Sequence, residues 1–364
     1  MHLYLHVPFC ARRCSYCDFA IAVRKQTPDA EYLAAIEAEW RWHREAGAFL
    51  GPIETLYLGG GTPSRLGAEA IARLVELVDR EGPLAEGAEV TLEVNPEDVS
   101  PSRAAGWLAA GIGRVSLGIQ SFDDDVLRWM HRVHDRTAAI RAVEVLRAAG
   151  LENLSLDLIY GLPAQLERDW EDDLETALAL RPDHLSFYGL TVEERTPLSR
   201  WVDRGVAVPA PDARFEAEYQ ATHRALVAGG FRHYEVSNAG LPGKESRHNL
   251  AYWTRRSYLG LGPSAHSFHD ERRWWNEREW VAYRDRVRGG AGAVAGEERL
   301  TPAQVALETR YLDLRTDRGI AASSLPVEVL STWLAAGWAR RVGSQVALTA
   351  DGWLRLDALV GQVE

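Results

Sequence analysis

The sequence predicts an α/β fold in which parallel strands and their connecting helices form a partial (β/α)6 barrel. Short runs of β-branched and aromatic residues alternate about six times with amphipathic segments, from the N-terminus to about residue 230. Such alternation is typical of βαβ units and a parallel sheet. Glycines or polar residues stand at the end of nearly every strand run, and active sites of parallel barrels are built at that rim.

The expected strands are LYLHV (3–7), ETLYLGG (54–60), VTLEVN (90–95), RVSLGIQ (114–120), NLSLDLIYG (153–161) and HLSFYGL (184–190). Amphipathic segments at 30–47, 68–82 and 137–150 are expected to be helices between these strands. The alternation stops near residue 230, so we expect the barrel domain to cover 1–230 and the sheet to end there. Residues 231–300 would then form a connecting region.

The C-terminal segment 301–364 is expected to be a winged-helix-like α+β module. Helical segments precede RRVGSQVALTADGW (340–353), which has the pattern of a hairpin before a last helix. This segment holds six arginines and seven acids, so no basic face for reading DNA is implied. We interpret it as a lid or a partner-docking module.

Composition excludes several classes of protein. The 364 residues carry a net charge of −11, which argues against a nucleic-acid binder held by phosphate contacts. No uncharged stretch is long enough to span a membrane, and the first residues enter a strand without the charged and apolar regions of a signal peptide. We therefore expect a cytoplasmic protein whose thiols stay reduced.

The chain's three cysteines, Cys10, Cys14 and Cys17, lie together on the loop after the first strand. An odd number in one cluster cannot form a disulfide framework. Cys14 and Cys17 have the spacing of a zinc knuckle, with His6 as a candidate fourth ligand, but no second ligand pair is visible. Three thiolates can instead hold a [4Fe–4S] cluster and leave one iron without a protein ligand. The residues favour iron–sulfur, and zinc stays an alternative.

The motifs YLHVPFCARRCSYCDF, YLGGGTPS, EVNPE, GIQSF and LDLIYGLP, in this order, resemble the radical S-adenosylmethionine (SAM) superfamily. Within it they resemble the branch that contains oxygen-independent coproporphyrinogen III dehydrogenase and a group of heme chaperones. The resemblance covers nearly the whole chain. It implies a [4Fe–4S] cluster whose free iron is chelated by the amino and carboxylate groups of SAM, which an electron can then cleave.

The same resemblance implies which residues contact SAM. Glycines let the backbone approach the cofactor closely, and a carboxylate accepts from hydroxyls or an ammonium. The positions that match the family's motifs are Tyr4, Gly60, Gly61, Thr62, Glu93, Gln120, Arg132 and Asp157.

Three features imply the chaperone group rather than the dehydrogenase. Phe19 stands where the dehydrogenase has a further cysteine, and we expect no N-terminal extension over the active site. HNLAYW (248–253) matches the H-N-x-x-Y-W element that the chaperone group uses for heme. The implied function is to bind heme and pass it to respiratory acceptor proteins, with peripheral contact to membrane complexes left open. The dehydrogenase of heme biosynthesis is the alternative, and a zinc-stabilised interaction protein is a third hypothesis.

His248 is the expected axial ligand of heme, because neutral imidazole suits iron, with His233 and His266 as alternatives. Tyr252 and Trp253 would offer flat apolar surface to the macrocycle. Residues 244–258 have a net charge of +3, which would favour heme propionates. The charged residues of this segment are Lys244, Glu245, Arg247, Arg255 and Arg256.

Overall fold

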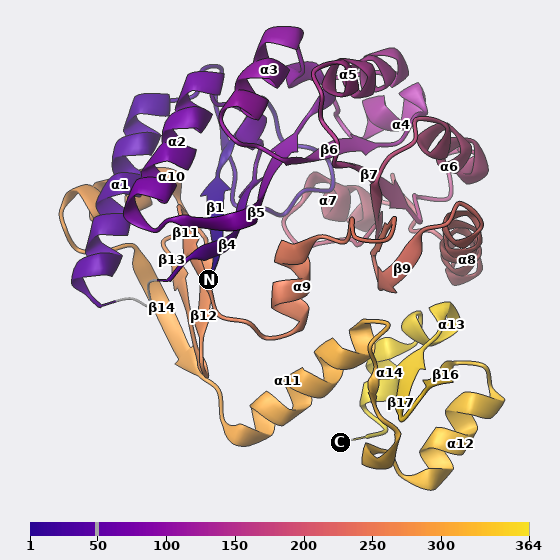
Figure 1. The fold of residues 1–364 in the computed structure, drawn as a ribbon. Coiled ribbons are helices and arrows are strands. Elements are labelled where there is room, and N and C mark those ends of the chain that lie inside the picture. The colour runs from indigo at the N-terminus through magenta and orange to yellow at the C-terminus, as the bar shows by residue number, and fades with distance from the viewer. Residues whose placement is uncertain (48–50, 364) are drawn as a thin grey trace.

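The computed structural model describes residues 1–47 and 51–363. In this part of the chain, twelve strands form one mixed sheet in the order β14-β13-β12-β11-β1-β4-β5-β6-β7-β8-β10-β9. The strands from β11 through to β8 are parallel, and those beyond them at both edges are antiparallel. Figure 1 shows helices on the outer side of the parallel strands. The predicted α/β fold with a partial barrel is confirmed.

The six predicted parallel strands are all present. They are β1 (His2–Val7), β4 (Ile53–Gly60), β5 (Leu84–Val94), β6 (Arg114–Gln120), β7 (Leu154–Tyr160) and β8 (His184–Gly189). Helices follow them in chain order: α1 (Asp29–Glu45), α2 (Ala68–Glu81), α3 (Pro101–Ala109), α4 (Asp124–Trp129), α5 (Arg136–Ala148), α6 (Trp170–Ala179), α7 (Pro197–Asp203) and α8 (Asp212–Ala228). Among the described residues, no helix is both long and apolar enough to cross a bilayer.

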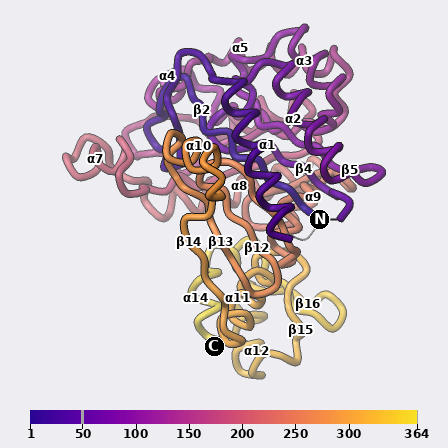
Figure 2. Tube along the Cα trace, turned by 90° about the vertical axis from the view of Figure 1, so that its left-hand side faces the viewer, coloured from indigo at the N-terminus to yellow at the C-terminus, as the bar shows by residue number. Residues whose placement is uncertain are grey.

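The sheet does not end near residue 230, which corrects the expectation from the sequence. Strands β9 (Arg232–Glu235) and β10 (Asn238–Gly240) extend the edge beside β8. At the other edge, β11 (Tyr258–Leu261) pairs parallel to β1. The edge continues through β12 (His266–His269), β13 (Arg272–Asn276) and β14 (Val294–Arg299). We call residues 258–299 the extension; Figure 2 shows β12 to β14 running away from the barrel toward the C-terminal module.

The remaining elements lie before, within and after the extension. Helix α9 (Arg247–Trp253) precedes it, and α10 (Trp280–Arg288), which lies within it, packs beside α1. The long helix α11 (Pro302–Arg315) leads to a small antiparallel sheet ordered β15-β17-β16. The hairpin expected at 340–353 is present as β16 and β17. The elements of this C-terminal module are β15 (Ile320–Ala321), α12 (Val327–Ala335), β16 (Ala339–Val342), β17 (Gln345–Leu348), α13 (Ala350–Trp353) and α14 (Leu356–Val360).

Strand β1 shows how the sequence separates core from site. Leu3, Leu5 and Val7 are fully buried in the hydrophobic core. Side chains alternate between the two faces of a strand, so Tyr4 and His6 lie on the opposite face. The register aligns these two residues with the inner face of β4. The inner face of the barrel is therefore lined with polar and aromatic side chains, while the outer face packs under the helices.

A buried carboxylate joins the barrel to the extension. Glu39 on α1 has no exposed surface, and its oxygens accept hydrogen bonds from the Gly262 backbone N–H (2.8 Å), the Asn276 amide (2.5 Å) and the Tyr283 hydroxyl (2.6 Å). Gly262 follows β11, Asn276 ends β13, and Tyr283 lies on α10. A buried charge is tolerated only when it is well hydrogen-bonded, and these three donors supply that environment.

Glu39→Ala should lower the free energy of unfolding by about 3 to 5 kcal/mol, because three buried donors lose their acceptor. Urea denaturation followed by circular dichroism measures this change. Glu37→Ala is the matched control, because Glu37 lies on the same helix with a half-exposed side chain. The control should stay within about 0.5 kcal/mol of the unchanged protein. Equal effects of the two substitutions would contradict the role given to Glu39.

Candidate functional site: two adjoining cavities

A cavity of about 490 Å³ opens at the C-terminal rim of the parallel strands; we call it the rim cavity. All three cysteines line it, and so do seven of the eight residues predicted to contact SAM. These seven are Gly60, Gly61, Thr62, Glu93, Gln120, Arg132 and Asp157. Residues from six different strands or strand ends thus meet in one space, as expected for a parallel barrel.

The cysteine loop is held to the rim by backbone hydrogen bonds. The short strands β2 (Phe9–Cys10) and β3 (Ala22–Val23) pair in parallel and close the loop at its base. The Ser15 N–H donates to the Met130 carbonyl (3.2 Å), and the Leu198 N–H donates to the Ser15 carbonyl (2.8 Å). The loop is therefore fixed on both sides, which keeps its thiols at the cavity wall.

The glycine run at the end of β4 is required by the chain's own packing. A Cβ on Gly61 would lie 2.7 Å from the Pro8 carbonyl oxygen and 3.0 Å from the Cys10 sulfur. A Cβ on Gly60, whose φ is +114°, would lie 2.7 Å from the His6 ring. These glycines let the cysteine loop approach the strand end, in addition to the access to a cofactor that the motif implies.

The residues present fit an iron–sulfur cluster better than a single zinc ion. Burial raises the pKa of the Cys10 thiol to about 11 and that of Cys17 to about 12, so metal must displace their protons. The Arg132 guanidinium lies 3.8 Å from the Cys14 sulfur and brings positive charge to the thiolates. Within residues 1–47 and 51–363, no three potential ligands converge on one metal ion. Both ring nitrogens of His6 are hydrogen-bonded, to the Tyr4 hydroxyl and the Ala20 carbonyl, so His6 is not placed as a fourth ligand.

Two carboxylates lie on the inner wall of the rim cavity. Glu93 accepts from the Tyr57 hydroxyl (2.9 Å) and the Gly60 N–H (3.0 Å), and burial raises its pKa to about 7. Asp157 accepts from the Ser116 hydroxyl (2.9 Å), and burial raises its pKa as well. Both are half-buried and face the cavity. They can accept hydrogen bonds from an ammonium or from hydroxyl groups.

Gln120 and Arg132 are positioned by specific backbone features. The register of β6 shifts between Gly118 and Gln120, and Gln120 has a φ of +73°, which is uncommon for a residue with a side chain. Such strained positions occur at functional sites. Arg132 donates to the Asn95 side-chain oxygen (2.8 Å) and the Gly118 carbonyl (2.6 Å), so it bridges the ends of β5 and β6.

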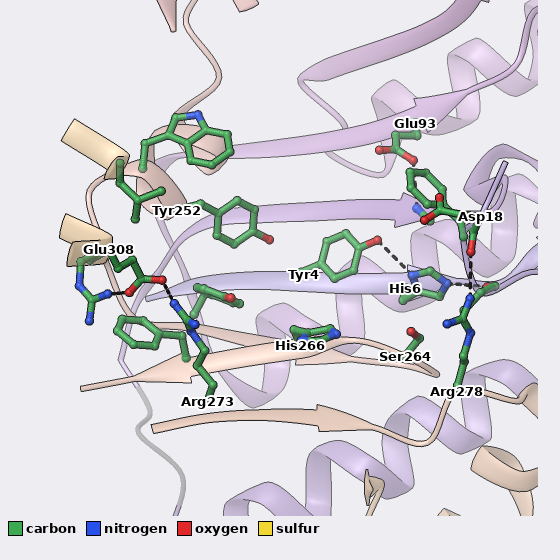
Figure 3. Close-up of a pocket in the computed structure, with 18 residues that line it drawn as sticks. Tyr4, His6, Asp18, Glu93, Tyr252, Ser264, His266, Arg273, Arg278 and Glu308 are labelled. Carbon is green, nitrogen blue, oxygen red and sulfur yellow. Dashed lines mark hydrogen bonds and ion pairs between the residues drawn. The ribbon is translucent and has the colours of Figure 1, made fainter. Parts of the chain in front are cut away.

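A second cavity of about 560 Å³ lies between the inner face of β1 and the extension; we call it the extension cavity (Figure 3). It shares Asp18, Phe19, Gly60 and Glu93 with the rim cavity. Tyr4 lies in the middle of β1 and lines the extension cavity, together with Gly60 and Glu93. Its contact with SAM stays a prediction.

His248, the expected axial ligand of heme, lines neither cavity. It is 1% exposed, its Nδ1 is hydrogen-bonded to the Thr55 hydroxyl (2.7 Å), and its Nε2 to the Tyr252 hydroxyl (2.8 Å). His233 is also buried and is hydrogen-bonded to His223. Of the three candidate histidines, His266 is the one that lines the extension cavity.

The basic residues of segment 244–258 do not form one patch. Arg255 lines the extension cavity. Lys244 donates to the Glu152 carbonyl, Arg247 to the Gly87 carbonyl, and Arg256 pairs with Glu54. The other cations of the cavity, Arg273 and Arg278, both come from the extension: Arg273 lies on β13, and Arg278 lies between β13 and α10.

Several lining residues were not predicted from the sequence. Ser116 and Tyr188 face the rim cavity, and Tyr258 and Phe268 face the extension cavity. Ser116 could have been found, because it stands two residues before Gly118 on the same strand face. The extension residues had no such signal, because the pairing of β11 with β1 joins segments far apart in the sequence.

Comparison with known proteins identifies the fold and the relatives of the chain. Residues 4–177 match the model of the radical SAM superfamily. The heme chaperone HemW of Mycobacterium tuberculosis is 38% identical over 98% of this chain and 93% of its own length. The heme chaperone HemW of Synechocystis is 37% identical over 89% of this chain and 80% of its own length. The structure of coproporphyrinogen III oxidase (HemN) from Escherichia coli, a radical SAM enzyme, superposes with a TM-score of 0.84 at 24% identity, covering 99% of this chain and 89% of that chain.

Glu93 should make stability depend on pH. Its pKa rises from 4.5 in the unfolded chain to about 7 in the fold, so its protonated form favours folding, and that contribution is lost as pH rises from about 5 to 8. Glu93→Gln should remove this loss, which is on the order of 2 kcal/mol after allowance for partial exposure. Urea denaturation of the cluster-free protein at about pH 5 and about pH 8 measures this loss of stability. Tyr57→Phe, which removes a donor to Glu93, should move the transition to higher pH; no pH-dependent difference in either variant would refute the assignment.

Proposed function

The chain belongs to the radical SAM superfamily, among the proteins named heme chaperone HemW, and we propose that it binds heme and passes it to acceptor proteins. The observation that carries this proposal is the extension cavity. It adjoins the rim cavity, is lined by aromatic side chains, and contains Tyr252 and Trp253 of the H-N-x-x-Y-W element. A flat apolar ligand next to the cysteine site is the arrangement that such a chaperone needs.

We propose that the rim cavity holds the [4Fe–4S] cluster and SAM. Cys10, Cys14 and Cys17 would ligate three irons, and the remaining iron would be open to SAM. When bound, the cluster supplies the single electron that radical SAM chemistry uses. Glu93 and Asp157 would accept from the polar groups of SAM, while Thr62, Gln120 and Arg132 would contact it from the neighbouring strand ends.

The acceptors are proposed to be respiratory heme proteins met in the cytoplasm or at the membrane surface. Three free cysteines suit a reducing compartment. The C-terminal module, residues 301–364, is the proposed docking or lid element, because α11 borders the extension cavity through Glu308 and Leu312. Residues 231–300 would supply half of the residues that line the heme site.

Anaerobic reconstitution should load about four irons and four sulfides per chain, with a broad absorbance that dithionite bleaches. Replacing Cys10, Cys14 or Cys17 singly by Ala should abolish loading, because each substitution removes one bridge to the cluster. Ser15→Ala, a change in the same loop that leaves the thiols in place, is the control and should load normally. Stoichiometric zinc without sulfide would rule out the cluster.

Heme added to the reconstituted protein should give a saturable Soret band at about one equivalent, and coproporphyrinogen III should not be converted to protoporphyrinogen IX. Decarboxylation requires close positioning of a propionate side chain, and an error of about 1 Å can cost on the order of a hundredfold in rate. A chaperone needs only a site that binds the macrocycle reversibly. Porphyrinogen analysis with SAM and a reductant tests this, and robust turnover would replace the chaperone proposal with the dehydrogenase.

A further inference from the structure

The extension cavity has the walls and the size that a planar macrocycle requires. Its volume of about 560 Å³ lies within the range of small-molecule and cofactor sites. Aromatic rings border it from β1, from the cysteine loop, from α9 and from the extension. They belong to Tyr4, Phe19, Tyr252, Trp253, Tyr258 and Phe268. Flat rings on several sides favour a flat apolar ligand over a sugar or a peptide.

His266 is the histidine of this cavity that can offer an imidazole nitrogen to a metal. It begins β12, its side chain is exposed, and within the described residues neither ring nitrogen makes a hydrogen bond. His6, in the same cavity, has both nitrogens occupied. Its partial burial in the cavity wall and the nearby Arg273 lower the pKa of His266 below its ordinary value, which favours the neutral ring. Neutral imidazole is a common axial ligand of heme iron.

One end of the cavity holds two guanidinium groups that share a single carboxylate. Glu308 on α11 forms ion pairs with both Arg255 and Arg273. Both guanidinium groups also lie over the ring of Phe268, at 4.9 Å and 5.9 Å from its centre. Figure 3 shows Arg273 and Glu308 at this end, Arg278 and Asp18 at the other, and His266 between them.

We propose that heme sits in the extension cavity with His266 as its axial ligand, and that its propionates take Arg255 and Arg273 from Glu308. This rests on the proposed function and locates the heme within it. The carboxylate of Glu308 is chemically equivalent to a propionate, so the exchange replaces one charge-assisted pair by another. The edge of the macrocycle that lacks propionates then points toward Asp18 and Phe19, which border the rim cavity.

The axial ligand is tested by heme titration of the cluster-loaded protein, with optical and electron paramagnetic resonance spectra. His266→Ala should shift the Soret band and remove the histidine-ligated signal, and added imidazole should restore both by entering the vacated space. His269→Ala, on the same strand but outside the cavity, is the control and should match the unchanged protein. His248→Ala should keep the histidine-ligated signal, because His248 lies outside the cavity.

The outcomes separate this inference from the proposed function. An unchanged spectrum in His266→Ala, or loss of the signal in His248→Ala alone, would overturn the ligand assignment while the protein remained a heme binder. Failure of the unchanged protein to bind heme would remove the proposed function itself. Loss of binding in His266→Ala that imidazole restores supports the assignment, since a misfolded variant would not recover.

The propionate exchange is tested by heme affinity. Glu308→Gln should bind heme several-fold more tightly, because it frees two guanidinium groups, and Arg273→Ala should bind about tenfold more weakly. Arg272→Ala is the matched control for the second variant. Arg272 is adjacent on β13, pairs with Glu297 and lies outside the cavity, so its loss should leave affinity unchanged. Weaker or equal binding by Glu308→Gln would refute the exchange.

Discussion

The three hydrogen bonds to the buried carboxylate of Glu39 are the interaction on which the arrangement of both cavities depends. They connect a helix that covers the barrel to the end of β11, the end of β13 and α10. Close packing reinforces the junction, because a Cβ on Gly262 would lie 2.4 Å from the His6 carbonyl oxygen. The extension is therefore a fixed part of the sheet, and the cavity between it and β1 has a defined shape.

The two cavities are parts of one surface, the inner face of the barrel and its continuation. Glu93 and Gly60 belong to both walls, and Glu93 is bound by Tyr57, whose ring stacks on His248 at 5.1 Å. His248 in turn holds Tyr252 in the wall of the extension cavity. The histidine of the H-N-x-x-Y-W element thus positions an aromatic wall and connects it to the cysteine rim.

The sequence predicted local features well and long-range pairings poorly. The run 114–120 coincides with β6, and the polar residues after each strand meet at the rim as expected. The four-residue strand β11 carries too little local pattern to reveal that it pairs with β1. Because the pairing of β11 with β1 was not predicted, the second cavity, which Tyr4 lines, was not predicted either. The burial of His248 could not be predicted, because a motif carries no information on burial.

Glu308 lies on α11, a helix that also contacts α14 and β9. The same α11 packs against α14, where the Tyr311 hydroxyl donates to Asp357 (3.1 Å), and Arg315 near its end pairs with Glu235 on β9. The wall of the extension cavity and the attachment of the C-terminal module are therefore parts of the same helix.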